Sequence, residues 1–114
     1  MANVAILGAS SNPERYAWRA LKLLVENHHT PFPVAIKERE IDGLKTYASL
    51  RDITAPIDTL TLYVSPDKVE ASLEDIIALR PRRAIFNPGT ESPAAMASLR
   101  AQGIVVEEAC TLVL

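Results

Sequence analysis

The stretch that decides the fold is residues 4–16, Val-Ala-Ile-Leu-Gly-Ala-Ser-Ser-Asn-Pro-Glu-Arg-Tyr, near the start of a 114-residue chain. Its four leading apolar residues predict a strand buried on both faces, and Gly8 ends that strand. A helix capped by Ser11 or Asn12 is predicted directly after the turn. Such a turn aims backbone N–H groups and the positive end of a helix dipole at one point. That point suits a phosphate, so the stretch predicts a nucleotide-binding turn.

This first helix has signals for its start and for its buried face. Pro13 suits the first turn, and the spacing of Ser11 and Glu14 is that of a capping box. Four apolar residues recur at helical spacing and predict the face that packs on the sheet. They are Ala17, Leu21, Leu24 and Val25.

Strands and helices alternate along the rest of the chain. Apolar or β-branched runs predict four more strands, at residues 33–36, 57–64, 84–87 and 104–107. Two more helices are predicted to begin within residues 65–67 and 88–93, and Gly103 to end the second of these. The side chains expected on their buried faces are Val69, Leu73, Ile76 and Ile77 in one helix and Ala94, Ala97 and Leu99 in the other.

The remaining stretches are a polar segment and an apolar end. Residues 37–56 predict a turn at Gly43 and a short helical piece near residues 47–52, and residues 111–114 are expected to dock on the body. Strands that alternate with helices predict a parallel sheet with right-handed crossovers. The expected fold is therefore α/β, with a Rossmann-like, doubly wound, mainly parallel five-stranded sheet in three α/β/α layers. Residues 1–114 are expected to form one domain.

Three strand-to-helix junctions, residues 8–13, 64–67 and 87–93, share proline together with Ser, Thr or Asn. In a parallel sheet all three lie beyond the carboxyl ends of the strands, where ligands bind. Helix N-termini would face one crevice there and suit a pyrophosphate. The same residue types are also ordinary helix caps, so the prediction depends on the convergence of three junctions. The hydroxyls expected at the crevice are those of Ser10, Ser11, Ser65 and Thr90.

A dinucleotide fingerprint is not present in this turn. Gly8 is in place, but a serine and a proline occupy the other two glycine positions of G-x-G-x-x-G. The fingerprint also needs an acidic residue at the end of the second strand, where this chain continues with Lys-Glu-Arg-Glu at residues 37–40. Lys37 or Arg39 could instead neutralise a phosphate on the ribose, and a solvated loop of alternating charge is the alternative.

Catalytic and metal-ligating groups are scarce. His28 and His29 fall at the far end of the first helix, away from the crevice, and no nucleophile, base and orienting group come together. We expect no catalytic and no metal-binding residue. Cys110 is the single cysteine, so neither an intrachain disulfide nor a multi-cysteine metal site is expected. Two roles are considered for Cys110: a small buried hydrophobic side chain, or a thiol that exchanges with a thiol ligand.

Composition narrows the class of partner. The net charge is −2 and hydrophobic residues make up 48% of the chain, which predicts a packed core and no nucleic-acid partner. The basic run Arg-Pro-Arg-Arg at residues 80–83 is expected to be a solvated loop. The sequence shows no signal peptide or membrane-length apolar run. We expect a cytoplasmic protein in a reducing compartment, and a protein partner or a homodimer stays open.

With these residues in hand, the chain resembles the small stand-alone CoA-binding proteins, which are similar to the CoA-binding domain of the succinyl-CoA synthetase alpha subunit. Five segments in the family's order carry the resemblance. They are residues 4–16 (VAILGASSNPERY), 43–53 (GLKTYASLRDI), 57–66 (IDTLTLYVSP), 84–91 (AIFNPGTE) and 103–114 (GIVVEEACTLVL).

The resemblance implies a Rossmann-like fold with CoA or an acyl-CoA as ligand. It places the nucleotide and pyrophosphate against Gly8, Ser10, Ser11, Asn12 and Arg15, with Lys37 near the nucleotide end. It places the next part of the site at Val64, Ser65 and Pro66, and the far side at Asn87, Pro88 and Gly89. The family commonly has Val-Asn-Pro after the second strand, where this chain has Ala-Ile-Lys at residues 35–37.

The function expected from these observations is non-catalytic binding of CoA or an acyl-CoA, as a carrier, sensor or regulatory module. In succinyl-CoA synthetase the phosphorylated histidine lies in a second domain, so the resemblance does not imply ligase activity for this chain. The alternatives are an NAD(P)-dependent oxidoreductase on the same fold and an interaction protein with a vestigial site. A further alternative is a redox role, in which Cys110 would form a mixed disulfide with the CoA thiol.

Overall fold

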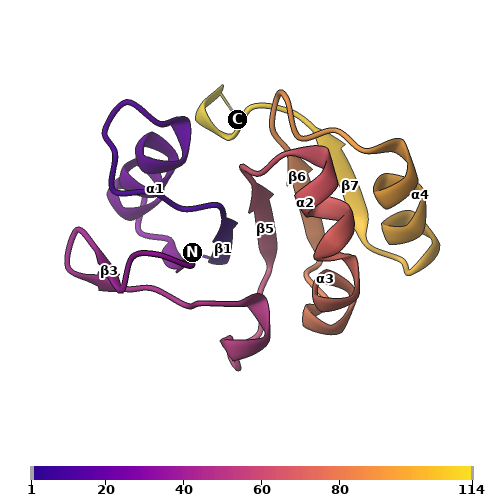
Figure 1. The fold of residues 1–114 in the computed structure, drawn as a ribbon, viewed down its shortest axis with the longest axis horizontal. Helices are drawn as coiled ribbons and strands as arrows, with labels where there is room; N and C mark the ends of the chain where they lie inside the picture. The colour runs from indigo at the N-terminus through magenta and orange to yellow at the C-terminus, as the bar shows by residue number, and fades with distance from the viewer. Residues whose placement is uncertain (1, 114) are drawn as a thin grey trace.

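Five parallel strands form the predicted sheet, in the order β2-β1-β5-β6-β7 (Figure 1). The computed structural model describes residues 2–113. In register, Leu7 of β1 lies opposite Val34 of β2 on one side and Leu62 of β5 on the other. The strands are β1 (Asn3–Leu7), β2 (Thr30–Val34), β5 (Thr59–Leu62), β6 (Arg83–Phe86) and β7 (Val105–Glu108).

Helices cover both faces of this sheet and give the predicted Rossmann-like α/β/α layers. Because successive strand residues face opposite sides, Leu60 and Phe86 pack in the larger core with α2, α3 and α4, whereas Val4 and Ile6 pack under α1. Among residues 2–113, no helix has the length and apolar character to cross a membrane. The helices are α1 (Tyr16–Glu26), α2 (Pro66–Ala71), α3 (Leu73–Leu79) and α4 (Pro93–Ala101).

The strand order reverses between β1 and β5. From β1 the chain moves outward to β2, and it then returns to the other side of β1 to place β5, β6 and β7. Connections that leave in opposite directions open a crevice at the carboxyl ends of the two central strands. In Figure 1 the loops after β5 and β6 and the C-terminal segment gather at the top of the view.

The first helix begins later than predicted. Helix α1 starts at Tyr16, and its N-cap, Arg15, makes no side-chain capping hydrogen bond. The expected capping box of Ser11 and Glu14 is wrong, because α1 begins only at Tyr16 and the Glu14 amide donates to Oδ1 of Asn12, while Ser11 donates its amide and its hydroxyl to Glu38. The residues before α1 therefore form a loop with its own hydrogen bonds.

The segment after β1 and α1 holds more regular structure than predicted. Strand β2 spans Thr30–Val34 rather than residues 33–36, because β1 selects this register for pairing. A small antiparallel hairpin, β3 (Glu40–Ile41) with β4 (Leu44–Lys45), follows and turns at the predicted Gly43. The predicted helical piece is a 3-10 helix over Leu50–Asp52.

The later helices differ from the expectation in their number and in which side chains they bury. The helix predicted after β5 is two helices that meet at Ser72. On α4 the expected inward residues Ala94 and Ala97 are exposed, because Ser92 caps this helix and sets a different buried face. Val25 of α1 is also 46% exposed, outside the buried stripe. The buried residues of α4 are Ala95, Met96 and Leu99.

The end of the chain docks on the sheet, as predicted. Thr111–Val113 form a 3-10 helix, and Leu114 lies outside the described residues. Thr111 is 8% exposed and its hydroxyl lies 2.7 Å from that of Thr61 on β5. The C-terminal turn therefore packs on the central strand.

Candidate functional site

A cleft of about 880 Å³ opens at the switch point, beyond the carboxyl ends of β1 and β5. This larger cleft is lined by the loop after β1, the end of β2 with residues 35–38, residues 48–50, residues 63–65 and parts of α2 and α3. A smaller cleft of about 300 Å³ lies beside it and reaches the loop after β6. The two clefts share a wall formed by Gly8, Ser10, Arg15, Tyr63, Val64 and Ser65.

Most residues predicted for the site line one of these clefts. Pro66 and Asn87 line neither, and of the two cations considered after β2, Lys37 lines the larger cleft and Arg39 does not. Pro88 and Gly89 line the smaller cleft. The predicted residues on the larger cleft are Gly8, Ser10, Ser11, Asn12, Arg15, Lys37, Val64 and Ser65.

Gly8 allows the ends of β1 and β5 to pack closely in the wall that the two clefts share. Its φ is +91°, and a Cβ at this position would lie 2.7 Å from the carbonyl oxygen of Tyr63 and 2.8 Å from Cγ1 of Val64. Both the backbone conformation and the space therefore require glycine. The close approach brings the end of β1 against the end of β5.

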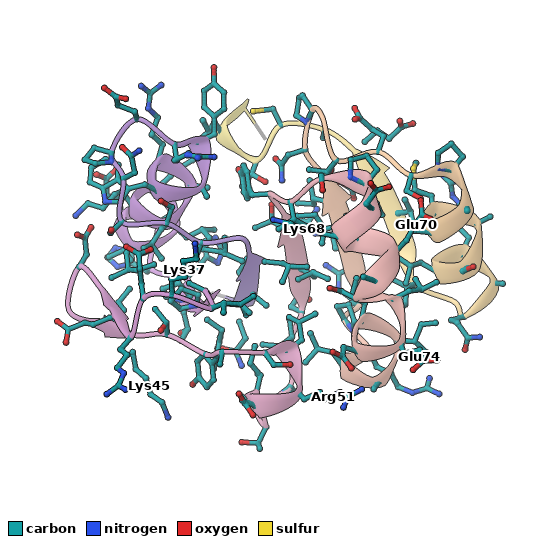
Figure 2. The ribbon with its side chains drawn as sticks, viewed as in Figure 1. Lys37, Lys45, Arg51, Lys68, Glu70 and Glu74 are labelled. Atoms are coloured by element: carbon teal, nitrogen blue, oxygen red, sulfur yellow. The ribbon has the colours of Figure 1, made fainter. Side chains whose placement is uncertain are left out.

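Three cations on the larger cleft have no carboxylate partner. Arg15, Lys37 and Lys68 line it, and none forms an ion pair with another of residues 2–113. Figure 2 shows Lys37 beside β1 and Lys68 at the start of α2. The sequence analysis missed Lys68, although its position one helical turn after Ser65 places it at the junction.

Both acidic residues on the same lining already have partners. Asp75 accepts from Nε of Arg51 at 2.5 Å, and Glu38 accepts from Ser11. Asp75 is paired with Arg51, and Glu38 keeps its negative charge although Ser11 holds it, so the three cations outnumber the one carboxylate on the cleft that has no ion-pair partner among the described residues. The lining therefore has the chemistry to hold an anionic ligand.

Asn87 is a structural residue in this arrangement. It is 2% exposed, and its Nδ2 donates to Thr61 Oγ1 at 2.7 Å and to the Leu62 carbonyl at 2.9 Å. Its Oδ1 accepts from the amide and the hydroxyl of Thr111. Its backbone carbonyl also accepts from the Thr90 hydroxyl at 2.7 Å. The Asn87 side chain thus links the loop after β6 to β5 and to the C-terminal 3-10 helix, behind the residues that line the clefts.

Tyr63 lines both clefts. Its hydroxyl is buried and makes no hydrogen bond with the rest of residues 2–113. Burial raises the pKa of this hydroxyl, and the Thr111 and Thr61 hydroxyls offset part of the rise although neither reaches hydrogen-bonding geometry with it. The polar end of the side chain therefore points away from the open space of the clefts.

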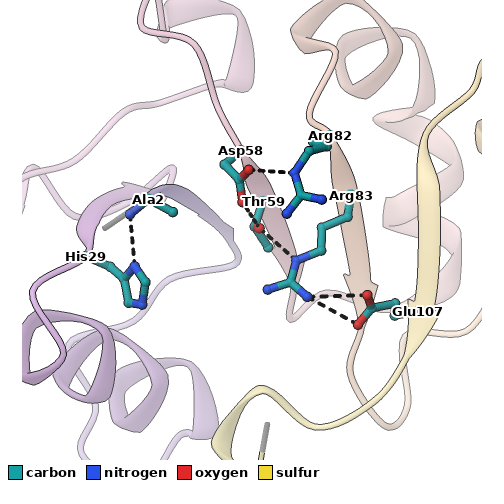
Figure 3. A network of polar contacts seen from close by, with 7 residues as sticks. All are labelled: Ala2, His29, Asp58, Thr59, Arg82, Arg83 and Glu107. Carbon is teal, nitrogen blue, oxygen red and sulfur yellow. Dashed lines mark hydrogen bonds and ion pairs between the residues drawn. The ribbon is translucent and has the colours of Figure 1, made fainter.

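A second polar network lies at the opposite, amino edge of the sheet (Figure 3). Asp58 accepts from Arg82 Nε at 2.8 Å and from the Thr59 hydroxyl at 2.7 Å. These hydrogen bonds, that of Arg82 first, hold the pKa of Asp58 below its ordinary value. Arg83 joins Thr59 to Glu107, at 2.9 and 3.3 Å. This network gives Arg82 and Arg83 of the basic run a structural role.

The histidines belong to that amino edge as well. Nδ1 of His29 accepts from the backbone amide of Ala2 at 3.0 Å and so ties the start of β1 to the end of the α1–β2 turn (Figure 3). His28 has a φ of +63° in the same turn and is exposed. Neither residue lines the two clefts described above.

The fold and the clefts define a Rossmann-like α/β domain with a cation-lined crevice at its switch point. The chain belongs to the CoA binding domain family, whose sequence profile matches residues 2–114. The resemblance expected from the sequence is therefore confirmed.

Relatives of known sequence or structure agree with this assignment. The alpha subunit of the ADP-forming acetate–CoA ligase II of Pyrococcus furiosus is 33% identical over 66 residues, which are 57% of this chain and 14% of that subunit. A Thermus thermophilus protein has a TM-score of 0.92 at 30% identity, over 98% of this chain and 86% of its own. A hypothetical protein of Pyrococcus horikoshii has a TM-score of 0.90 at 31% identity, over 96% and 78%.

Proposed function

We propose that the protein binds CoA or an acyl-CoA reversibly, without acting on it chemically, as a carrier, sensor or regulatory module. The observation that carries the proposal is the set of cations on the larger cleft, Arg15, Lys37 and Lys68, without ion-pair partners among residues 2–113. CoA carries a pyrophosphate and a ribose 3′-phosphate, so it needs several separated cations. Membership of the family supports the same ligand.

The two clefts suit the two ends of such a molecule. The phosphates would lie in the larger cleft, against the loop after β1 and the three cations, and Lys37 would meet the ribose phosphate. The pantetheine arm would cross the shared wall at Gly8 and Val64 toward Gly89 in the smaller cleft. Backbone amides, hydroxyls and cations would hold the ligand there, with no bond made or broken.

A non-catalytic role is supported by the state of the titratable groups. The carboxylates of Glu38 and Asp75 are held by Ser11 and Arg51, and the Tyr63 hydroxyl is buried. A general acid or base must reach the reacting atom by a hydrogen bond. Glu38 has both carboxylate oxygens engaged, Asp75 has one engaged by Arg51, and the Tyr63 hydroxyl is buried, so few groups are placed to transfer a proton.

Titration calorimetry with CoA, dephospho-CoA and NADPH tests the proposal. We expect saturable binding of CoA to one site, weaker binding of dephospho-CoA and still weaker binding of NADPH. No binding of CoA at millimolar concentration would overturn the proposal, and tighter binding of NADPH would favour an NAD(P)-dependent enzyme. Native mass spectrometry of the freshly purified protein would show whether an acyl-CoA or CoA comes with it.

The same mass measurement tests a covalent mode of binding. Cys110 is partly buried and lines neither cleft, so we propose reversible, noncovalent binding rather than a mixed disulfide with the CoA thiol. A CoA-sized adduct on untreated protein that is lost in Cys110→Ser would reverse this choice.

A further inference from the structure

The loop after β1 already holds an anion, and that anion comes from the chain itself. The amide of Ser11 donates to Oε2 of Glu38 at 3.1 Å, and the Ser11 hydroxyl donates to Oε1 of the same carboxylate. Two oxygens that accept from a neighbouring N–H and O–H are also what a bound phosphate would present. Glu38 therefore occupies donors on which a ligand phosphate would depend.

Three other amides of this loop, those of Gly8, Ala9 and Asn12, donate to the loop itself or to the neighbouring strand β2. The Gly8 and Ala9 amides both donate to the Val34 carbonyl, at 3.2 and 3.1 Å. The Asn12 amide donates to the Ser10 hydroxyl oxygen at 3.0 Å. These bonds come from the loop itself or from the paired strand β2. Ser11 differs, because its partner is a long side chain from a segment 27 residues away.

The backbone around Glu38 is held by hydrogen bonds, so only its side chain would have to rotate for the carboxylate to leave Ser11. Its carbonyl accepts from the Thr46 hydroxyl, and the Thr46 amide donates to the carbonyl of Arg39 at 3.1 Å. These bonds hold the segment against the β3–β4 hairpin. The carboxylate can therefore leave Ser11 by side-chain rotation, without movement of the cleft wall.

We propose that Glu38 is a specificity-determining residue of the site, because its carboxylate competes with the ligand phosphate for the two donors of Ser11. The proposal rests on the proposed function. A ligand must break two charge-assisted hydrogen bonds to enter, and a single phosphate gains little from replacing one anion by another. A ligand with several phosphates also reaches Arg15, Lys37 and Lys68. The site would thus take polyphosphorylated nucleotides such as CoA and exclude AMP and inorganic phosphate.

Glu38→Gln tests this competition, since the amide keeps the shape and one acceptor oxygen but loses the charge. We expect the variant to bind CoA about tenfold more tightly than the natural protein in titration calorimetry, and AMP to gain at least as much. Glu40→Gln is the matched control, because Glu40 on β3 is exposed, lines neither cleft and has the same charge. Its affinity for CoA is expected to stay within about twofold, as is usual for a screened surface charge.

The outcomes separate this inference from the proposed function. Absence of CoA binding by the natural protein and by both variants would overturn the proposed function and this inference with it. Binding by the natural protein without a gain in Glu38→Gln would overturn the competition alone. Glu38→Ala removes both acceptor oxygens and is expected to show the same gain. A loss of affinity in both Glu38 variants, with an unchanged Tm, would mean that Glu38 shapes the loop for the ligand instead of competing with it.

Discussion

Oδ1 of Asn87 accepts hydrogen bonds from both the amide and the hydroxyl of Thr111, at 2.9 and 3.0 Å. Through Nδ2 the same side chain holds Thr61 and Leu62 of β5. One buried amide therefore joins the end of β6, the carboxyl end of β5 and the C-terminal 3-10 helix. An asparagine that the family resemblance places on the ligand has its side chain committed to the fold.

Asn87→Ala is expected to lower the free energy of unfolding by about 3 kcal/mol, because several buried donors and acceptors lose their partner at once. Urea unfolding at neutral pH measures this loss. Asn27→Ala is the control, since Asn27 is exposed and donates one hydrogen bond to the Leu23 carbonyl. Its cost is expected to stay below about 1 kcal/mol. Equal losses in the two variants would contradict the role given to Asn87.

Gly8→Ala is expected to destabilise the fold by about 3 kcal/mol, because it adds an unfavourable positive φ to an overpacked contact with Tyr63 and Val64. Gly103→Ala separates these two effects. Gly103 has a φ of +80° but no atom within 4 Å of an added Cβ. Its cost is expected to be about 1 kcal/mol, the conformational part alone. Denaturant unfolding of both variants checks the difference, which vanishes if the close approach of β1 and β5 is unimportant.

Lys37→Ala is expected to weaken CoA binding about tenfold and dephospho-CoA binding less than about threefold, because the ribose 3′-phosphate would lose its cation. Calorimetric titrations of the two ligands give the comparison. Lys45→Ala serves as the control, since Lys45 points outward from the β3–β4 hairpin and lines neither cleft (Figure 2). An equal loss for both ligands would place Lys37 on another part of the molecule.

Asp58→Asn is expected to reduce stability slightly at neutral pH, with a Tm lower by no more than about 3 °C, because the Asp58–Arg82 pair is partly exposed and screened. The folded-state pKa of Asp58 is depressed. Its contribution is therefore present above the ordinary carboxyl pKa and disappears as the pH falls through the lower folded value. Thermal unfolding of both proteins from pH 7 to pH 2 should show two curves that converge at the acid end. A gap that persists there would exclude an electrostatic origin.

Tyr63→Phe is expected to leave stability unchanged or to raise it by up to about 1 kcal/mol, because the buried hydroxyl that it removes makes no hydrogen bond. Urea unfolding is again the measurement. A loss well above 1 kcal/mol would show that the hydroxyl is satisfied in solution, through a partner such as Thr111.

The sequence predicts the sheet and its ligand edge because both depend on local patterns. Apolar strand runs and the proline-containing junctions are each read within about ten residues, and parallel pairing brings the junctions to one edge. The contacts that differ from prediction are long-range. Ser11 donates its amide and its hydroxyl to Glu38 from another segment, and Oδ1 of Asn87 accepts from Thr111.

The β3–β4 hairpin and the buried face of α4 could not be predicted, because the local sequence pattern is too weak in both. Strands β3 and β4 have two residues each, too few to show an alternating pattern. On α4, alanines occupy both faces, so hydrophobicity alone does not choose between Ala94 and Ala95. Capping by Ser92 and contact with the core decide that the second of them is buried.

The wall that the two clefts share has a consequence for how ligand size translates into affinity. A molecule long enough to fill both clefts presents its second half at a high effective concentration once the first half is bound. Its affinity then exceeds that of either fragment by far more than an extra contact would add. Cut at the point where it crosses Gly8, such a ligand would become two weak binders that no longer help each other.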